Sequence, residues 1–251
     1  ENLNAISDTD IWKETDWIYN ENDRKWRFEF GDSKMKLSLS ELVDNFKKDD
    51  YKYSLPDVWS NENFYYLYPE AKNDIVFFIV DRPHQKQIIL AESGYKNGKF
   101  IITLTVNFEK YEIIRANQDG SGSANRRANA TIAHETQHYL QGRHNFGKAK
   151  GIDTINREVQ RVSDELRHRT PSIQDERERN KFLTILDEIE RNKDSIAYLI
   201  YWFQPAEQEA FNVSDRIDLS VSERKEIPPY PLPNYDIIYY HKRGYTHGGY
   251  I

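Results

Sequence analysis

The residues of this chain whose types and spacing could do chemistry together lie in residues 130–142, which read ATIAHETQHYLQG. This stretch holds His134, Glu135 and His138 in the order His-Glu-x-x-His. Residues four apart lie on the same face of a helix, so the two imidazoles can bind one metal ion. Glu135 lies about 100° further round the helix. From there its carboxylate can reach a water molecule on that ion but cannot act as a third ligand.

This pattern predicts the site of a zinc peptidase, in which a carboxylate takes a proton from water on the metal. The same three residues also occur on exposed helices that have no metal role. Here the flanking residues are helical and partly apolar, a strand pattern precedes them, and Gly142 stands where it could end the helix. These features favour a buried active-site helix packed under a sheet.

A zinc site of this type needs a third protein ligand, and His144 is one candidate. It fits the last position of the longer pattern His-Glu-x-x-His-x-x-Gly-x-x-His. However, Gln141 stands where that pattern has glycine, and Gly142 comes one residue late. The pattern also needs a downstream methionine turn, whereas the one methionine, Met35, lies far upstream.

The other candidate lies in residues 205–211, which read PAEQEAF. Pro205 suits the first position of a helix, which places Glu207 and Glu209 in its first turns. Residues two apart point in different directions, so only one of the two can coordinate the metal. The small Ala210 shares the face of Glu207 and lets two helices approach, so we predict Glu207 as the ligand. Glu209 would then accept a hydrogen bond from a ligand histidine, or be a plain exposed carboxylate.

Composition limits the other classes of function. The chain has 251 residues, with 38% hydrophobic and 14% aromatic residues and a net charge of −6. These values allow a real core, and no basic patch suggests a nucleic-acid partner. The absence of cysteine excludes disulfides, thiolate zinc sites and cysteine nucleophiles. No apolar run approaches the ~18 residues of a membrane span. A start at Glu1 without methionine suggests a fragment, a processed product or an excised domain.

The elements that must position the site can be predicted from periodicity and turn signals. The Ser38-x-x-Glu41 spacing predicts a helix over residues 39–48, and Asn97-Gly98 predicts a hairpin. The other expected elements are a strand at 26–30, a short helix within 55–70, strands at 74–80, 86–92 and 100–106, and a loop at 118–123 directly before the metal helix.

The strand at 100–106 is predicted to run along the active-site cleft. One of its faces should pack on the core, and its outer edge should stay unpaired so that an extended substrate can add to it. A plain sheet strand is the alternative.

Three helices are expected after the metal helix. The first follows an apolar stripe from Ile155 to Leu166 and is broken at Thr170-Pro171-Ser172. The second covers residues 173–192. The third is capped by Asp194, and its body, IAYLIYWF, is apolar all round and is therefore expected to be buried.

Four segments of the chain together carry a resemblance to a known family. They are Tyr68-Pro69-Glu70, Thr131 to Gln141, Ala206 to Asn212 with Arg216, and Ser222-Glu223-Arg224-Lys225 with Pro228-Pro229. Through them the chain resembles the zincin-like metallopeptidase domains of large polyvalent proteins of phages and mobile elements, over roughly residues 55–230. Two positions depart from the family pattern, Ala206 for glycine and Phe211 for arginine.

The resemblance implies an α+β zincin-like fold, with a small mixed or antiparallel sheet packed on the metal helix and additional helices C-terminal to it. It also implies glutamate as the third zinc ligand. We expect an N-terminal aromatic-rich subdomain or extension at 1–54, the metallopeptidase domain at 55–230 with a helical insertion at 152–193, and a tail at 231–251. Arg216 is expected to pair with a carboxylate near the site. In the tail, His241, Tyr245 or His247 could stabilise the oxyanion. The favoured alternative is that each is a plain loop residue, because loops carry such residues freely.

The predicted function is therefore a zinc-dependent peptidase with His134, His138 and Glu207 as ligands and Glu135 as the base. Its partner would be a protein or peptide substrate, with no nucleic acid and no membrane. The alternative is a structural or cargo domain of a phage or mobile-element protein, in which zinc only stabilises the fold. The resemblance suggests the bacterial cytoplasm or a virion as the setting, within a larger polyprotein.

Overall fold

The computed structural model describes residues 11, 17–20, 25–28, 37–46, 52–117, 121–145 and 150–226. The chain divides into two compact units, one formed by Glu1–Phe146 with Glu209–Ile251 and the other by Gly147–Gln208. The expected insertion at 152–193 lies within the second unit. The boundary between Gln208 and Glu209 falls inside one continuous helix, α11 (Pro205–Asp215).

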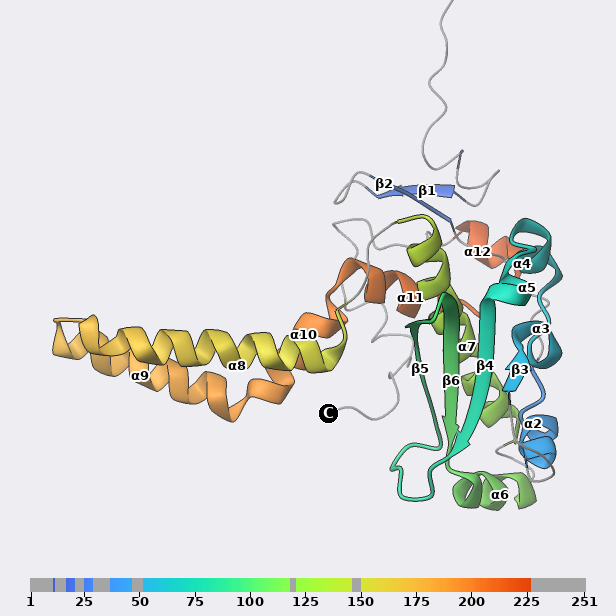
Figure 1. The fold of residues 1–251 in the computed structure, drawn as a ribbon, viewed down its shortest axis with the longest axis horizontal. Helices are drawn as coiled ribbons and strands as arrows, with labels where there is room; N and C mark the ends of the chain where they lie inside the picture. The colour runs from blue at the N-terminus through green and yellow to red at the C-terminus, as the bar shows by residue number, and fades with distance from the viewer. Residues whose placement is uncertain are drawn as a thin grey trace, which may run out of the picture. The chain divides into compact units, whose positions relative to one another are not determined.

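A four-stranded mixed sheet forms the centre of the first unit, in the order β3-β4-β6-β5 (Figure 1). Its strands are β3 (Lys52–Ser54), β4 (Ile75–Asp81), β5 (Ile89–Lys96) and β6 (Lys99–Val106). β4 and β6 run parallel, while β3–β4 and β5–β6 are antiparallel. Together with the helices, this sheet gives the α+β class with a small mixed sheet that the sequence predicted.

The strand expected at 100–106 is present as β6, but its predicted free edge is wrong. β6 pairs with β4 on one side and with β5 on the other, and within the described residues β5 has β6 as its one sheet neighbour. Side-chain polarity explains this order. Phe100, Ile102 and Leu104 of β6 are buried, whereas Glu92 and Lys96 of β5 are exposed, and polar side chains suit an edge strand.

The β5–β6 hairpin confirms the prediction from Asn97-Gly98. Both residues have positive φ, 52° and 76°, which a two-residue turn of this kind requires. β5 begins later than the expected residue 86. Residues before it form a loop, in which the carbonyls of Pro83 and Gln85 accept hydrogen bonds from Asn107 Nδ2 at 2.7 and 3.1 Å.

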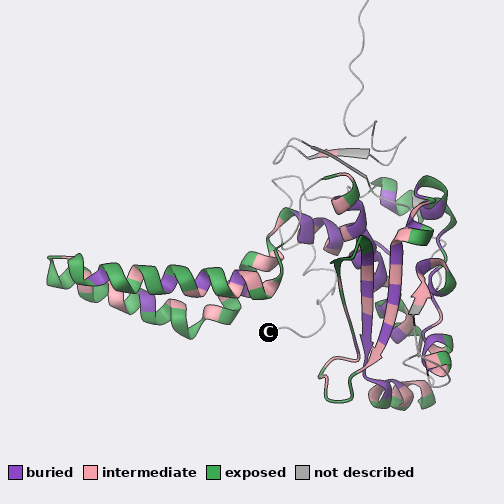
Figure 2. Cartoon of the chain, viewed as in Figure 1, coloured by how far each residue is buried: buried purple, intermediate pink, exposed green. Residues whose placement is uncertain are grey.

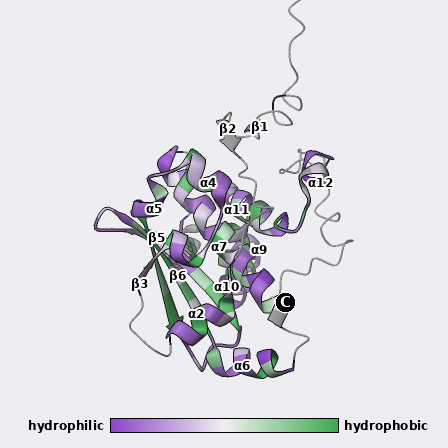
Figure 3. Ribbon diagram, turned by 90° about the vertical axis from the view of Figure 1, so that its right-hand side faces the viewer, coloured by the Kyte–Doolittle hydropathy of each residue, from purple (hydrophilic) through white to green (hydrophobic). Residues whose placement is uncertain are grey.

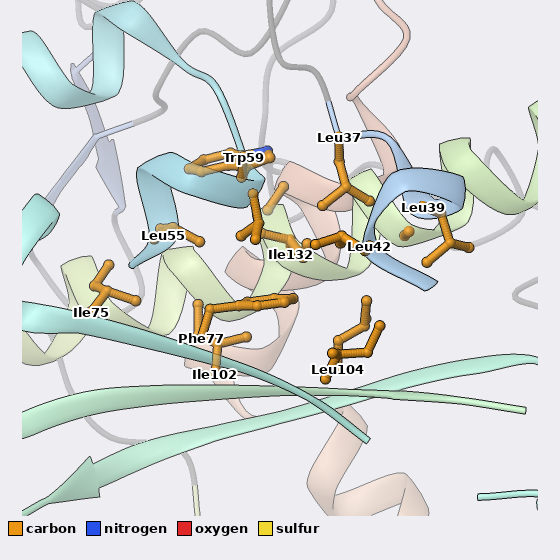
Figure 4. Packing of buried hydrophobic residues seen from close by; sticks show 14 of the residues in the cluster. Leu37, Leu39, Leu42, Leu55, Trp59, Ile75, Phe77, Ile102, Leu104 and Ile132 are labelled. Atoms are coloured by element: carbon orange, nitrogen blue, oxygen red, sulfur yellow. The ribbon is translucent and has the colours of Figure 1, made fainter. Parts of the chain in front are cut away.

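The core of the first unit lies between this sheet and a long helix, α7 (Ser121–Arg143). Phe77 and Ile102 of the sheet and Ile132 of α7 are fully buried there, and Trp59 and Leu55 cover them from shorter elements (Figure 4). The strands of the sheet are among the most hydrophobic stretches in Figure 3. The predicted packing of the His-Glu-x-x-His helix against a sheet is thus present, because α7 contacts β5 and β6.

Short helices complete the first unit. The predicted helix at 39–48 is α2 (Leu39–Phe46), whose first turn is capped by Ser38 Oγ accepting from Glu41 N at 3.4 Å. The single helix expected within 55–70 is two helices, because Asn61 accepts from Phe64 N at 3.0 Å and starts a new one. The remaining elements are α3 (Leu55–Val58), α4 (Glu62–Leu67), α5 (Ala71–Asp74), α6 (Phe108–Ala116), α12 (Val221–Glu226) and the hairpin β1 (Trp17–Asn20) with β2 (Lys25–Phe28).

The ends of α7 differ from the sequence prediction. Residues 121–123, expected in a loop, already belong to the helix. Gly142 does not end it, because the helix runs to Arg143 and the left-handed residue beyond it is Asn145, with φ 55°. Gly142 instead permits a close approach, since a Cβ there would lie 2.9 Å from Cε2 and Oη of Tyr95.

The second unit consists of helices. α8 (Ile152–Arg169) is followed by a 3₁₀ turn at Thr170–Ser172, where the break was predicted, and then by α9 (Glu176–Arg191) and α10 (Lys193–Trp202). Most of α8 and α9 is exposed or half-buried (Figure 2). Among the described residues, no helix combines the length and the apolar character that crossing a membrane requires.

The predicted burial of residues 196–203 is wrong. Ala197 is fully buried, but Leu199, Ile200 and Phe203 are 54%, 48% and 55% exposed. A helix that is apolar all round needs neighbours on every side. Within its unit, α10 packs mainly on α8 and only slightly on α9, so part of its surface stays uncovered.

Candidate metal centre

Helix α7 directs His134 and His138 toward the same point. Their Nε2 atoms lie 3.2 Å apart, and their rings are nearly perpendicular, with centroids separated by 4.9 Å. The four-residue spacing on a helix produces this arrangement. His134 is buried and His138 is half-buried. Two imidazole nitrogens are thus already placed side by side.

Glu207 of α11 joins the two histidines. One ligand atom from each of His134, His138 and Glu207 lies within 4.8 Å of the others, so the three could hold a metal ion. Glu207 is only 2% exposed. Two imidazole nitrogens and a carboxylate oxygen form a donor set that zinc accepts. The residues present therefore fit a metal ion of this kind.

The rival ligand, His144, lies elsewhere. Its Nε2 is 3.0 Å from Tyr68 Oη, and the two rings meet edge to face. Burial, followed by the neighbouring positive charge of Arg143, lowers the pKa of His144, although Glu70 opposes this shift. His144 is not one of the three residues that converge.

Glu135 is buried on the same helix as the two histidines. Its Oε2 accepts a hydrogen bond of 2.6 Å from Ser93 Oγ on β5. This contact joins the edge strand to the metal helix. Sequence analysis did not identify Ser93, because a lone serine within a strand carries no signal that it faces a glutamate 42 residues later.

Glu209 is buried, so the alternative of a plain exposed carboxylate is wrong. It is 1% exposed, and its two oxygens accept from Gln137 Nε2 at 2.7 Å and from Gln141 Nε2 at 3.1 Å. Gln141 also contacts a histidine, because its Oε1 lies 2.8 Å from His138 Nδ1. The amide of Gln141 therefore links Glu209 to His138.

The Tyr68-Pro69-Glu70 segment anchors the C-terminal end of α7. Tyr68 contacts His144, and Glu70 Oε1 lies 2.7 Å from Arg143 Nη2. Burial, with a smaller contribution from Glu70, raises the pKa of Tyr68 to about 12. The phenol therefore stays protonated near neutral pH and can donate a hydrogen bond.

Phe211 of α11 flanks the site, because its ring lies against that of His134, with centroids 4.7 Å apart. Arg216, directly after α11, is buried and donates to the carbonyl of Arg224 at 3.0 Å, while Arg224 donates to the carbonyl of Arg216 at 2.6 Å. These bonds connect the end of α11 to α12. The ion pair expected for Arg216 stays a prediction, and His241, Tyr245 and His247 lie outside the described residues.

Comparisons with protein-family models, with curated proteins and with solved structures find no match to this chain. Function is therefore inferred from the residues and geometry of the site itself.

Proposed function

We propose that this protein is a zinc-dependent peptidase whose metal ligands are His134, His138 and Glu207. The observation that carries the proposal is the convergence of these three ligand groups on the helix that also carries a buried glutamate, Glu135. A second carboxylate beside a three-ligand set is a group that a hydrolytic centre needs as a base and that a site which only stabilises a fold does not need. The proposed setting in a phage or mobile-element protein depends on the motif resemblance alone.

Each protein group has a defined part in the proposed hydrolysis. When bound, a zinc ion supplies a Lewis acid that polarises the peptide carbonyl and acidifies water. Glu135 accepts the proton of the attacking water on a carboxylate oxygen, and it returns that proton to the amine nitrogen as the carbon–nitrogen bond breaks. Ser93 holds Oε2 of Glu135, so we assign the proton transfer to Oε1.

The decisive experiment replaces Glu135 with glutamine. Cleavage of an unstructured substrate such as casein should fall by about 10²–10⁴-fold, because proton transfer is lost. Bound zinc, measured by mass spectrometry, should not change, since His134, His138 and Glu207 are intact. Glu165→Gln on α8 is the matched control and should keep the parent rate.

Two outcomes would count against the proposal. Cleavage by Glu135→Gln at the parent's rate would show that Glu135 is not the base. If the unmutated protein binds zinc but cleaves no substrate, the result would favour the alternative role, that of a structural or cargo domain.

We also propose that substrate binds in extended form along β5, the edge strand that carries Ser93. Backbone hydrogen bonds to a strand edge recognise extended chain largely independently of side chains. We therefore expect reduced, alkylated ribonuclease to be cleaved more than about tenfold faster than the native form, which exposes extended segments only on local unfolding. Equal rates on gel time courses would contradict this mode of binding.

A further inference from the structure

Two glutamines of α7 meet one carboxylate of α11 in the interior beside the metal centre. Gln137, Gln141 and Glu209 are each at most 1% exposed. Gln137 Nε2 and Gln141 Nε2 donate to different oxygens of Glu209, at 2.7 and 3.1 Å. Buried side-chain networks of this kind are costly unless their members are hydrogen-bonded. Because all three side chains are buried, their contact needs a structural or functional explanation.

The direction of these hydrogen bonds is set by chemistry. A carboxylate accepts and does not donate, so each glutamine must turn its NH₂ group toward Glu209. The carbonyl oxygen of Gln141 then faces His138 Nδ1, which lies 2.8 Å away. An oxygen at that position accepts, so Nδ1 must carry the hydrogen. The neutral imidazole then has its lone pair on Nε2.

That lone pair is on the nitrogen that the metal centre needs. His138 Nε2 lies 3.2 Å from His134 Nε2, on the side of the ring where the ligand groups converge. The other tautomer would place a hydrogen there and block coordination. We propose that Glu209 is a positioning residue, which fixes the metal-binding tautomer of His138 through the amide of Gln141. This inference depends on the proposed metal centre but not on peptidase activity.

The alternative is that Glu209 only stabilises the packing of α7 against α11 and has no effect on His138. Gln137 separates the two explanations, because it contacts the same carboxylate but is not part of the chain of bonds to His138. A joining role predicts similar effects from losing either glutamine contact. A positioning role predicts an effect on His138 only when the path through Gln141 is altered.

The test uses Glu209→Gln, with Gln137→Met as the matched control. The new amide at 209 can donate to Gln141, which can then rotate and offer its own NH₂ to His138. We would record the tautomer of His138 in the metal-free protein by long-range ¹⁵N–¹H correlation at about pH 8, above the ordinary imidazole pKa of about 6.5. Zinc affinity would be measured by competition with a chelator.

We expect the parent and Gln137→Met to show hydrogen on Nδ1 and to bind zinc equally within about threefold. Glu209→Gln should shift the population toward hydrogen on Nε2 and weaken zinc binding by about 10–100-fold, as loss of an outer partner does. Gln141→Met should weaken zinc binding similarly. The double variant Glu209→Gln/Gln141→Met should bind zinc about as weakly as Gln141→Met alone, because both changes break the same path of hydrogen bonds to His138.

The proposal is overturned if Glu209→Gln keeps the Nδ1 tautomer and the parent's zinc affinity, or if Gln137→Met weakens zinc as much. If Glu209→Gln does not fold by circular dichroism, Gln141→Met decides through the same two readouts. A parent that fails to cleave peptides leaves both readouts intact, so failure of the peptidase assignment is distinguishable. A metal-free parent with hydrogen on His138 Nε2 would also refute the inference.

Discussion

The interiors of the two compact units of this chain differ in how much apolar side chain they bury. In the first, Trp59, Phe77 and Ile102 are completely buried between the sheet and α7. In the second, the apolar cluster consists of Ile155, Val159 and Ala197, with a few half-buried neighbours. Its helices are also linked by ion pairs at the surface, which contribute little to stability.

This difference bears on where a buried polar network can form. Groups that position a metal ligand must be held to within about 0.5 Å by packed neighbours. In the buried polar network of Gln137, Gln141 and Glu209, each carboxylate oxygen of Glu209 accepts a hydrogen bond from one glutamine amide. All three of these residues fall in the first unit.

The largest expected effect comes from a matched pair of phenylalanines. Phe77 in the first unit is 0% exposed and Phe203 in the second is 55% exposed. Phe77→Ala should lower the free energy of unfolding by about 3–5 kcal/mol, since it leaves a cavity. Phe203→Ala should change it by less than about 0.5 kcal/mol. Urea titrations followed by circular dichroism measure both, and equal costs would remove the contrast.

A smaller effect is expected at Gly142. Alanine is preferred to glycine inside a helix by about 0.5–1 kcal/mol. Its Cβ would, however, lie 2.9 Å from two atoms of the Tyr95 ring. Gly142→Ala should therefore stabilise the protein in a Tyr95→Ala background and gain clearly less in the parent. Urea unfolding of the four proteins measures this coupling. The same gain in both backgrounds would show that the close contact has no energetic importance.

The smallest effect concerns Arg167 of α8, which pairs with Asp187 and Glu190 of α9 at 3.2 and 2.9 Å. Arg167→Gln should lower the thermal midpoint slightly in dilute buffer. The difference should vanish in 1 M NaCl, where the screening length is about 3 Å. Arg161→Gln, which alters a pair within α8, is the control. A shift that persists in salt would indicate packing by Arg167 rather than charge.

The sequence predicted the parts of the fold that depend on local rules. The spacing of His134 and His138 implied a shared helix face, and Pro205 marked the first residue of the helix that carries Glu207. Asn97-Gly98 predicted the hairpin through its need for positive φ. Each of these inferences depends on residues within a few positions of one another, where backbone geometry alone decides.

The parts that were wrong depend on which elements become neighbours. Among the described strands, β5 and not β6 lies at an edge, because strand order is set by the packing of the whole sheet. Leu199, Ile200 and Phe203 are about half exposed because, within the described part of its unit, α10 packs mainly on α8. A side chain at Gly142 would meet Tyr95, which lies in the hairpin 47 positions earlier, and Ser93 donates a hydrogen bond to Glu135, which is 42 residues away in the sequence and so outside any local pattern. Periodicity shows which face of an element is apolar, but it does not show what covers that face.

The measurement that tests the central claim most directly is anomalous diffraction from crystals grown with zinc, recorded on both sides of the zinc absorption edge. We expect an anomalous-difference peak for zinc at about 2.0–2.2 Å from each of His134 Nε2, His138 Nε2 and a carboxylate oxygen of Glu207. A peak at His144 or Glu209, or none at the three converging residues in crystals that contain zinc, would contradict it.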